Sequence, residues 1–308
     1  MSRVRLWERL SGVGVEMASS VRLLVEALRV GDLRRVLAAY LGFSVAEMAN
    51  FIAILIYAYE VGGSPALGLV AFLQLAPAAV FAPVGATLGD RFRREVMLTV
   101  AYAVFAAATV LVAIALYTAW PVGVIYLLAA VNATVLTLVR PFHESLLPAL
   151  ARSTEQLAAG YVAGGTIENL GLIAGPLLAG LTAATWGIGA VFVVTTALLL
   201  VGTILVWGVQ TRTAADPGTG QNAVQMTLEG LGVFRQSRPR VILVLLNSVI
   251  FLAGVLDVAI IVLAFEVFGS EDAGTAWLNA VIGVGAAAGS VLAVVLIGRR
   301  HLASSMWR

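Results

Sequence analysis

Three carboxylates lie within long apolar stretches of this 308-residue sequence, namely Glu47, Glu168 and Asp257. An ionised acid at the middle of a bilayer costs at least about 2.5 kcal/mol on insertion scales, so such residues usually face a cavity or a partner. A carboxyl group that binds a proton on one side of a membrane and releases it on the other can drive exchange. Asn50 lies three residues after Glu47, on the same helix face. We therefore expect Glu47, Asn50, Glu168 and Asp257 to couple protons or contact a substrate.

A structural role for the same acids stays open. Each acid could be neutral and hydrogen-bonded to Asn132, Asn247 or a hydroxyl group, and it would then serve only helix association. Gln74, Asn247 and Asn279 are further candidates for substrate contact.

The composition places the elements that carry these side chains in lipid. Apolar residues make up 60% of the chain and charged residues only 12%, and the mean hydropathy is +0.98. Soluble proteins carry about 25% charged residues, so soluble enzymes and nucleic-acid-binding proteins are excluded. The absence of cysteine and the presence of only two histidines, His143 and His301, argue against a disulfide framework or a metal centre. Because no nucleophile and base pair or phosphate-binding loop is evident, we expect neither an enzyme nor a cofactor.

Eight apolar stretches are long enough to cross a bilayer core of about 30 Å as helices. The connections between them alternate between short uncharged turns and loops that carry arginine. A cytoplasmic N-terminus places every arginine-bearing connection inside the cell. We predict a multi-pass plasma-membrane protein with a cytoplasmic N-terminus and with spans near residues 38–59, 66–88, 96–117, 121–140, 158–184, 187–208, 241–267 and 274–297.

The chain divides into four predicted segments. Residues 1–37 carry arginines and an apolar stripe, a pattern typical of an amphipathic helix on the membrane surface or on the cytoplasmic face of the bundle. Residues 38–208 are predicted to form a six-helix bundle. Residues 209–240 are a predicted cytoplasmic linker, and residues 241–308 are predicted to be the first two helices of a second bundle. Equivalent features recur at an offset of about 205 residues, as in a parallel repeat of six-helix units.

A turn rich in glycine and arginine follows the second predicted span, with the sequence Gly85-Ala86-Thr87-Leu88-Gly89-Asp90-Arg91-Phe92-Arg93-Arg94. The glycines allow close helix approach, the aspartate can accept hydrogen bonds from turn amides, and the arginines hold the turn inside. This turn resembles the loop between the second and third helices of the major facilitator superfamily, although the glycine before the basic pair is absent. We expect it to lock one arrangement of the helices and release another, through Gly85, Gly89, Asp90, Arg91, Arg93 and Arg94.

A second resemblance lies in the predicted fifth span. Gly171, Gly175, Pro176 and Gly180 are similar to the G-x-x-x-G-P-x-x-G-G pattern of antiporters in that superfamily, although the final glycine pair is incomplete. The resemblance implies export in exchange for protons. Close packing is the alternative, because small residues four apart form a groove for a neighbouring helix and a proline bends the span.

Arg140 ends the predicted fourth span and is followed by Pro141. It resembles the fourth-helix arginine of the superfamily, which implies a place beside the transport pathway. The alternative is that Arg140 only anchors the cytoplasmic end of its helix.

The resemblance covers nearly the whole chain, yet the superfamily has two bundles of six helices, whereas eight spans are predicted here. The resemblance therefore implies an all-α, polytopic membrane protein, apparently truncated after the eighth helix. We expect proton-coupled efflux of a small hydrophobic or amphiphilic molecule by alternating access. The alternative is a non-transporting remnant or an interaction subunit that needs a partner chain. The expected partners are the lipid bilayer, a small-molecule substrate and protons, without nucleic acid.

Overall fold

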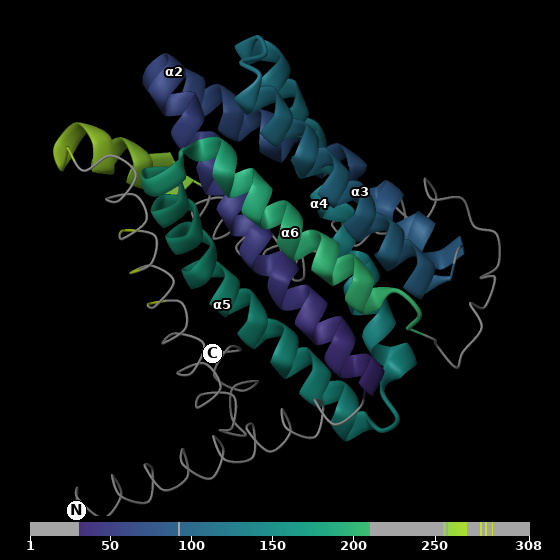
Figure 1. Cartoon of the computed structure of the whole chain (residues 1–308). Coiled ribbons are helices and arrows are strands. Elements are labelled where there is room, and N and C mark those ends of the chain that lie inside the picture. Colours follow the sequence, from purple (N-terminus) through teal and green to yellow (C-terminus); the bar gives the residue numbers. More distant parts are fainter. Residues whose placement is uncertain are drawn as a thin grey trace, which may run out of the picture.

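The computed structural model describes residues 31–91, 93–209, 255–256, 258–269 and the single positions 278, 281 and 285, with the backbone alone for residues 76–91, 138 and 155. These residues form long α-helices and one π-helical turn, without a strand among them (Figure 1). Five helices are long and apolar enough to cross a membrane, which confirms the predicted all-α membrane fold. The elements are α2 (Gly31–Arg91), α3 (Arg94–Tyr117), α4 (Val122–Leu150), α5 (Thr154–Trp186), α6 (Ile188–Val206) and η1 (Leu263–Val267).

The 61-residue α2 contains two membrane spans. A straight helix of that length would measure about 90 Å, roughly three times the bilayer core. Gly63 interrupts it with a φ of 64° and a ψ of −160°, a conformation that only glycine adopts easily because it lacks a Cβ atom. The two halves correspond to the predicted spans 38–59 and 66–88, and the first half begins at Gly31.

The prediction that the fourth span ends at residue 140 is wrong. The helix α4 continues through Pro141 and Pro148 to Leu150. A proline removes one backbone donor from a helix, but its fixed φ is compatible with helical geometry. Burial compensates for the lost bonds, because this last part of α4 contributes buried apolar side chains to the core, at Phe142, Leu146, Leu147 and Leu150.

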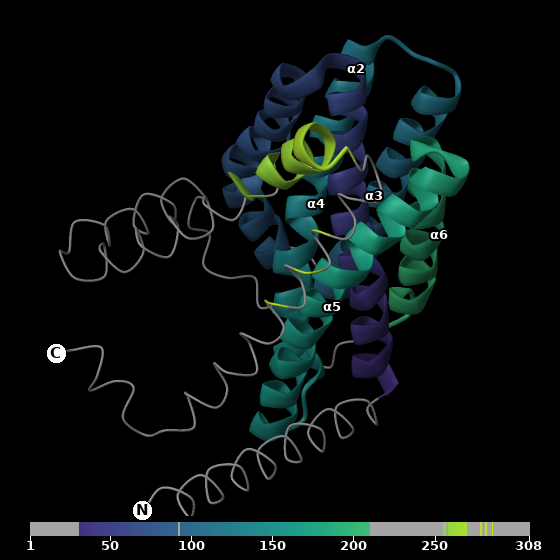
Figure 2. The ribbon, with the colours of Figure 1, turned by 90° about the vertical axis from the view of Figure 1, so that its left-hand side faces the viewer.

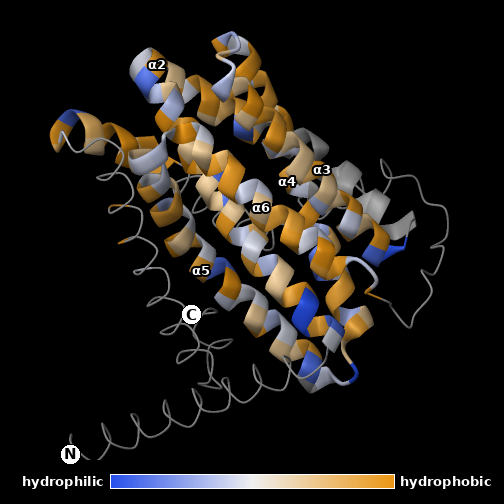
Figure 3. Cartoon of the chain, viewed as in Figure 1, coloured by the Kyte–Doolittle hydropathy of each residue, from blue (hydrophilic) through white to orange (hydrophobic). Residues whose placement is uncertain are grey.

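The first half of α2 is the centre of the bundle. It packs against α4, α5 and α6, while α3 packs against α4 and α6 (Figures 1 and 2). Inside the bundle, Phe43 meets the rings of Tyr102 and Phe105 edge to face. The outer faces carry exposed apolar side chains such as Leu127 and Ile204 (Figure 3). A helix that is apolar on its outer face suits a lipid environment.

The described part of the seventh predicted span packs against α2 around its break at Gly63. Ile261 belongs to a buried cluster with residues of α2, and Phe265 contacts the ring of Tyr59. Glu266 accepts hydrogen bonds from Tyr59 and Ser64. These contacts tie residues 258–267 to α2 on either side of its break at Gly63.

Residues 210–240 of the predicted linker 209–240, and most of the predicted segments 1–37 and 241–308, lie outside the described residues. The boundaries of the four predicted segments therefore stay predictions.

Two glycines of α5 lie directly against α2. A Cβ atom on Gly171 would lie 2.8 Å from the carbonyl oxygen of Ser44, and one on Gly175 would lie 2.4 Å from Cβ of Met48. Both distances are shorter than real Cβ contacts allow. Pro176 and Gly180 of the same predicted motif are buried. The small residues therefore let two membrane helices approach backbone to backbone beside Glu47.

We expect Gly175→Ala to lower the free energy of unfolding by about 1–3 kcal/mol, because the new methyl group forces α5 away from α2. Thermal unfolding of the purified protein in detergent measures this loss. Gly165→Ala is the matched control in the same helix, since no atom lies within 4 Å of its new Cβ. Equal unfolding midpoints for the two variants would show that α5 does not depend on this close approach.

Candidate functional site

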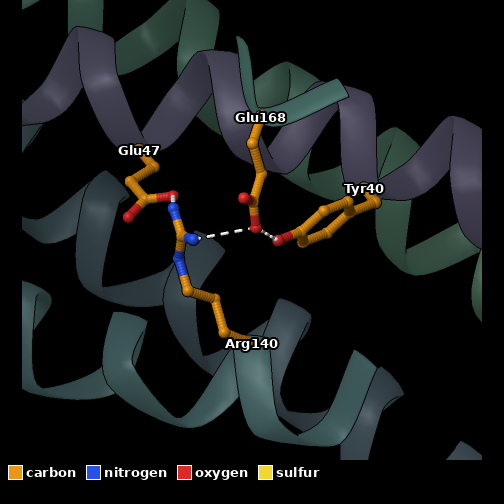
Figure 4. Close-up of polar contacts among 4 residues, drawn as sticks. All are labelled: Tyr40, Glu47, Arg140 and Glu168. Atoms are coloured by element: carbon orange, nitrogen blue, oxygen red, sulfur yellow. Dashed lines mark hydrogen bonds and ion pairs between the residues drawn. The ribbon is translucent and has the colours of Figure 1, made fainter. Parts of the chain in front are cut away.

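An arginine bridges two acids from different helices inside the bundle. Nη2 of Arg140 in α4 donates to Oε2 of Glu47 in α2 at 2.9 Å, and Nη1 donates to Oε1 of Glu168 in α5 at 2.9 Å (Figure 4). The planar guanidinium presents its donors in a fixed fork, so one arginine can serve two carboxylates at once. The structure thus brings together three predicted site residues that are far apart in sequence.

Tyr40 extends this network on the same side of Glu168. Its hydroxyl donates to Oε1 of Glu168, the oxygen that also accepts from Arg140 (Figure 4). The Tyr40 ring stacks on buried His143, with centroids 3.8 Å apart and ring planes 7° apart. Tyr40 lies two helical turns before Glu47, and His143 lies one turn after Arg140. Neither Tyr40 nor His143 was predicted to belong to this site. Their helical spacing nevertheless places both residues beside ones that were predicted.

The charges in this network do not balance when both acids are ionised. Two carboxylates then face one guanidinium, which leaves one negative charge in excess. The Glu47 side chain is only 10% exposed, whereas the side chains of Arg140 and Glu168 are 39% and 36% exposed. The buried acid therefore depends on Arg140 more than Glu168 does, because water cannot replace the lost partner as easily.

Asn50 belongs to a second polar group, deeper in the bundle. Its Oδ1 accepts from Thr195 of α6 at 2.7 Å, and its Nδ2 donates to Thr109 of α3 at 3.4 Å. Asn132 of α4 donates to the same Thr109 oxygen at 3.0 Å. Four helices are thus joined by amide and hydroxyl groups, one turn along α2 from Glu47.

The structure bears on both alternatives that the sequence left open. Glu47 and Glu168 both accept hydrogen bonds from Arg140, and Glu168 also accepts one from Tyr40. Asn132 donates to Thr109. A cytoplasmic anchor does not account for the two acids that Arg140 contacts, since the helix continues beyond it to Leu150. The role of these residues in proton coupling stays a prediction, and Asp257 lies outside the described residues.

The predicted gating turn is short, because α2 ends at Arg91 and α3 begins at Arg94. Arg93 pairs with Glu95 at 2.7 Å, and Arg94 donates to the carbonyl oxygen of Ser145 in α4 at 3.1 Å. Arg94 therefore ties the start of α3 to α4, whereas Arg93 pairs within the first turn of α3. The backbones of Gly85, Gly89, Asp90 and Arg91 form the last turns of α2, and their side chains lie outside the described part.

Among the residues that the structure describes, no group of three or more acids or histidines lies close enough together to hold a metal ion.

A comparison with protein families identifies the fold that holds this network. The family model described as the Major Facilitator Superfamily matches residues 36–304. This chain belongs to the major facilitator superfamily. The match confirms the resemblance found in the sequence, and together with the membrane-length helices it identifies a multi-pass membrane protein of that superfamily.

Two curated relatives show how far the similarity extends. The chain is 26% identical over 202 residues to Macrolide efflux protein A of Streptococcus pyogenes, and equally to the protein of that name from a serotype M6 strain. Each match covers 64% of this chain and 49% of the relative. The matched region thus spans about half the length of these relatives.

We expect Arg140→Met to lower the free energy of unfolding by about 1–3 kcal/mol, because it leaves the buried Glu47 carboxylate without its charged partner. Unfolding in detergent at neutral pH measures the loss. Adding Glu47→Gln to this variant removes the unpaired charge and is expected to restore part of the stability. Arg152→Met, at an exposed position after α4, serves as the control and is expected to change stability by less than about 0.5 kcal/mol. A loss that Glu47→Gln does not relieve would contradict the pairing.

Proposed function

We propose that this superfamily member is a proton-coupled exporter of a small hydrophobic or amphiphilic molecule. The observation that carries the proposal is the bridge from Arg140 to buried Glu47 and to Glu168 within the membrane spans. Ionisable residues at this depth are costly and mark ion or proton pathways in transporters. The efflux direction is supported by the name of the relatives, Macrolide efflux protein A.

The charge imbalance supports proton coupling. When Glu47 or Glu168 takes up a proton, Arg140 keeps one ionised partner and the excess negative charge disappears. The three helices α2, α4 and α5 are then held by a different set of ion pairs. A protonation event can therefore bias the relative stability of two helix arrangements, as alternating access requires.

The close packing of α5 against α2 supports a movement of α5 when the ion pairing of Glu168 changes. Gly171 and Gly175 place α5 in backbone contact with α2 next to Glu47, so little side-chain material separates the two helices. A change in the ion pairing of Glu168 therefore acts on α5 beside the place where α5 contacts α2. We propose that Gly171, Gly175, Pro176 and Gly180 set the path of this motion.

Macrolides are the first substrates to test, because the relatives carry that word in their names. The residues beside Glu47 include aromatic and aliphatic side chains such as Phe51, Ile54 and Leu136. Apolar surroundings with a few polar groups are typical of sites that bind amphiphilic molecules.

The arginine distribution supports a cytoplasmic N-terminus in the cell membrane. The chain has no cysteine, so single-cysteine variants report position without background. We expect Thr154→Cys, at the start of α5, to react with a membrane-impermeant maleimide only in permeabilised cells. Thr118→Cys, after α3, is expected to react in intact cells as well. The reverse pattern would overturn the proposed orientation.

Glu47→Gln tests the proposed function directly. The purified chain is reconstituted in vesicles that contain a pH-sensitive dye, and a radiolabelled macrolide is added. We expect the unaltered chain to move protons in response to the macrolide, and Glu47→Gln to lose this response by tenfold or more, because a neutral amide cannot exchange a proton. Glu144→Gln is the matched control, since Glu144 is exposed on α4 outside the network.

Two results would contradict this proposal. Unchanged coupled transport in Glu47→Gln would remove Glu47 from the proton site. Binding of the macrolide by the folded chain without any proton movement would overturn transport by this chain alone and would support dependence on a partner chain.

A further inference from the structure

A small cavity lies within the bundle on the side of Glu47 that faces away from α5. Residues of α2, α3, α4 and α6 line it. Its walls are largely apolar and include the rings of Phe51, Phe105 and Phe192. About 20 Å³ is open to the centre of a water molecule, which is enough room for one water.

Four polar side chains face this cavity, namely Glu47, Asn50, Gln74 and Asn132. The two asparagines are held in place by Thr109 and Thr195, so their amide groups have fixed orientations. A buried water molecule needs two to four polar partners as well as room. The cavity meets both conditions.

The buried amide group of Gln74 is an independent observation that indicates a molecule bound in the cavity. Its side chain is in the second half of α2 and is only 7% exposed. Its Nε2 is fully buried and has no hydrogen-bond partner among the described residues. Buried amide donors almost always have a partner, because an unmade bond costs the full desolvation of the group. The occupant must therefore accept a hydrogen bond.

We propose that the cavity binds one ordered water molecule, which Gln74 holds against Glu47. A metal cation is a poorer occupant, since Gln74 presents an N–H group and the guanidinium of Arg140 already pairs with Glu47. A substrate group is not needed to account for Gln74, because the space of about 20 Å³ that is open to the centre of a water molecule already holds one water. Glu47 then has two polar partners on opposite sides, Arg140 and the water.

This arrangement gives the water a role that rests on the proposed function. A carboxyl group that exchanges protons must be stabilised in its site both when it is ionised and when it is protonated. The water supplies a hydrogen bond to Glu47 that persists when Arg140 turns to Glu168. Gln74 is therefore a positioning residue for proton coupling, and it acts through the water it holds.

Radiolytic hydroxyl labelling of the ligand-free protein tests the water site without any transport assay. X-ray pulses convert ordered waters into hydroxyl radicals, which oxidise the side chains next to them, and mass spectrometry locates the products. We expect oxidation of Phe105 and Phe192, which line the cavity, although both are 2% exposed or less. Phe43 is equally buried and does not line the cavity, and we expect it to stay unlabelled.

A variant that fills the cavity is compared with a control variant that adds the same volume at an exposed position. Ala133 lines the cavity, so Ala133→Leu is expected to reduce labelling of Phe105 and Phe192 to the level of Phe43. Ala107→Leu adds the same volume at an exposed position of α3 and is expected to leave the labelling unchanged. If Ala133→Leu does not fold, Ala129→Val introduces a smaller group into the same cavity. Unlabelled rings in the unaltered protein, or labelling that persists in a folded cavity-filling variant, would overturn the water site.

The consequence for coupling is tested with Gln74→Leu, which removes the donor and keeps a similar volume. We expect macrolide-driven proton movement to fall about tenfold, the effect of losing one hydrogen bond to a charged group, while macrolide binding is retained. Unchanged proton movement would remove Gln74 from the coupling machinery. If the unaltered chain moves no protons, the proposed function fails, and labelling of Phe105 and Phe192 still decides the water site by itself.

Discussion

The ion bridge at Arg140 is the interaction on which the rest of the structure depends. A membrane interior cannot hold an unpaired charge at low cost, so the arginine, which is always charged, must meet an ionised acid, and an acid without that partner must be protonated. The two acids and the arginine come from three helices, α2, α4 and α5. The helices must therefore approach one another at the depth of Arg140, and their packing is constrained by this requirement.

The surrounding residues satisfy that constraint in different ways. Gly171 and Gly175 bring α5 against α2, and the continuation of α4 beyond Pro141 places Arg140 in the interior of a helix. The stacked rings of Tyr40 and His143 fill the space beside Glu168. In the exchange that we propose, a proton taken up by one acid would leave Arg140 paired with the other acid, on a different helix. That change of partner links the packing of the superfamily fold to the exchange.

Much of the fold could be predicted from the sequence because lipid imposes simple rules on length, hydropathy and arginine position. The spans that correspond to α2, α3, α5 and α6 were predicted within a few residues, except that the first begins at Gly31. The fourth span was predicted to end at residue 140, whereas buried side chains beyond Pro141 stabilise the helix as far as Leu150. Local sequence does not contain the tertiary contacts that decide such a case.

The sequence by itself determined which residues would be costly in a membrane, since Glu47, Glu168 and Arg140 stand out against apolar neighbours through charge alone. It also determined the superfamily, through the turn after the second span. Only the tertiary structure decided that these three residues meet, that Tyr40 joins them and that a cavity lies behind Glu47. The physical reason is that helical periodicity fixes the face of a residue on its own helix, while the depth and rotation of neighbouring helices follow from close packing between residues far apart in the chain.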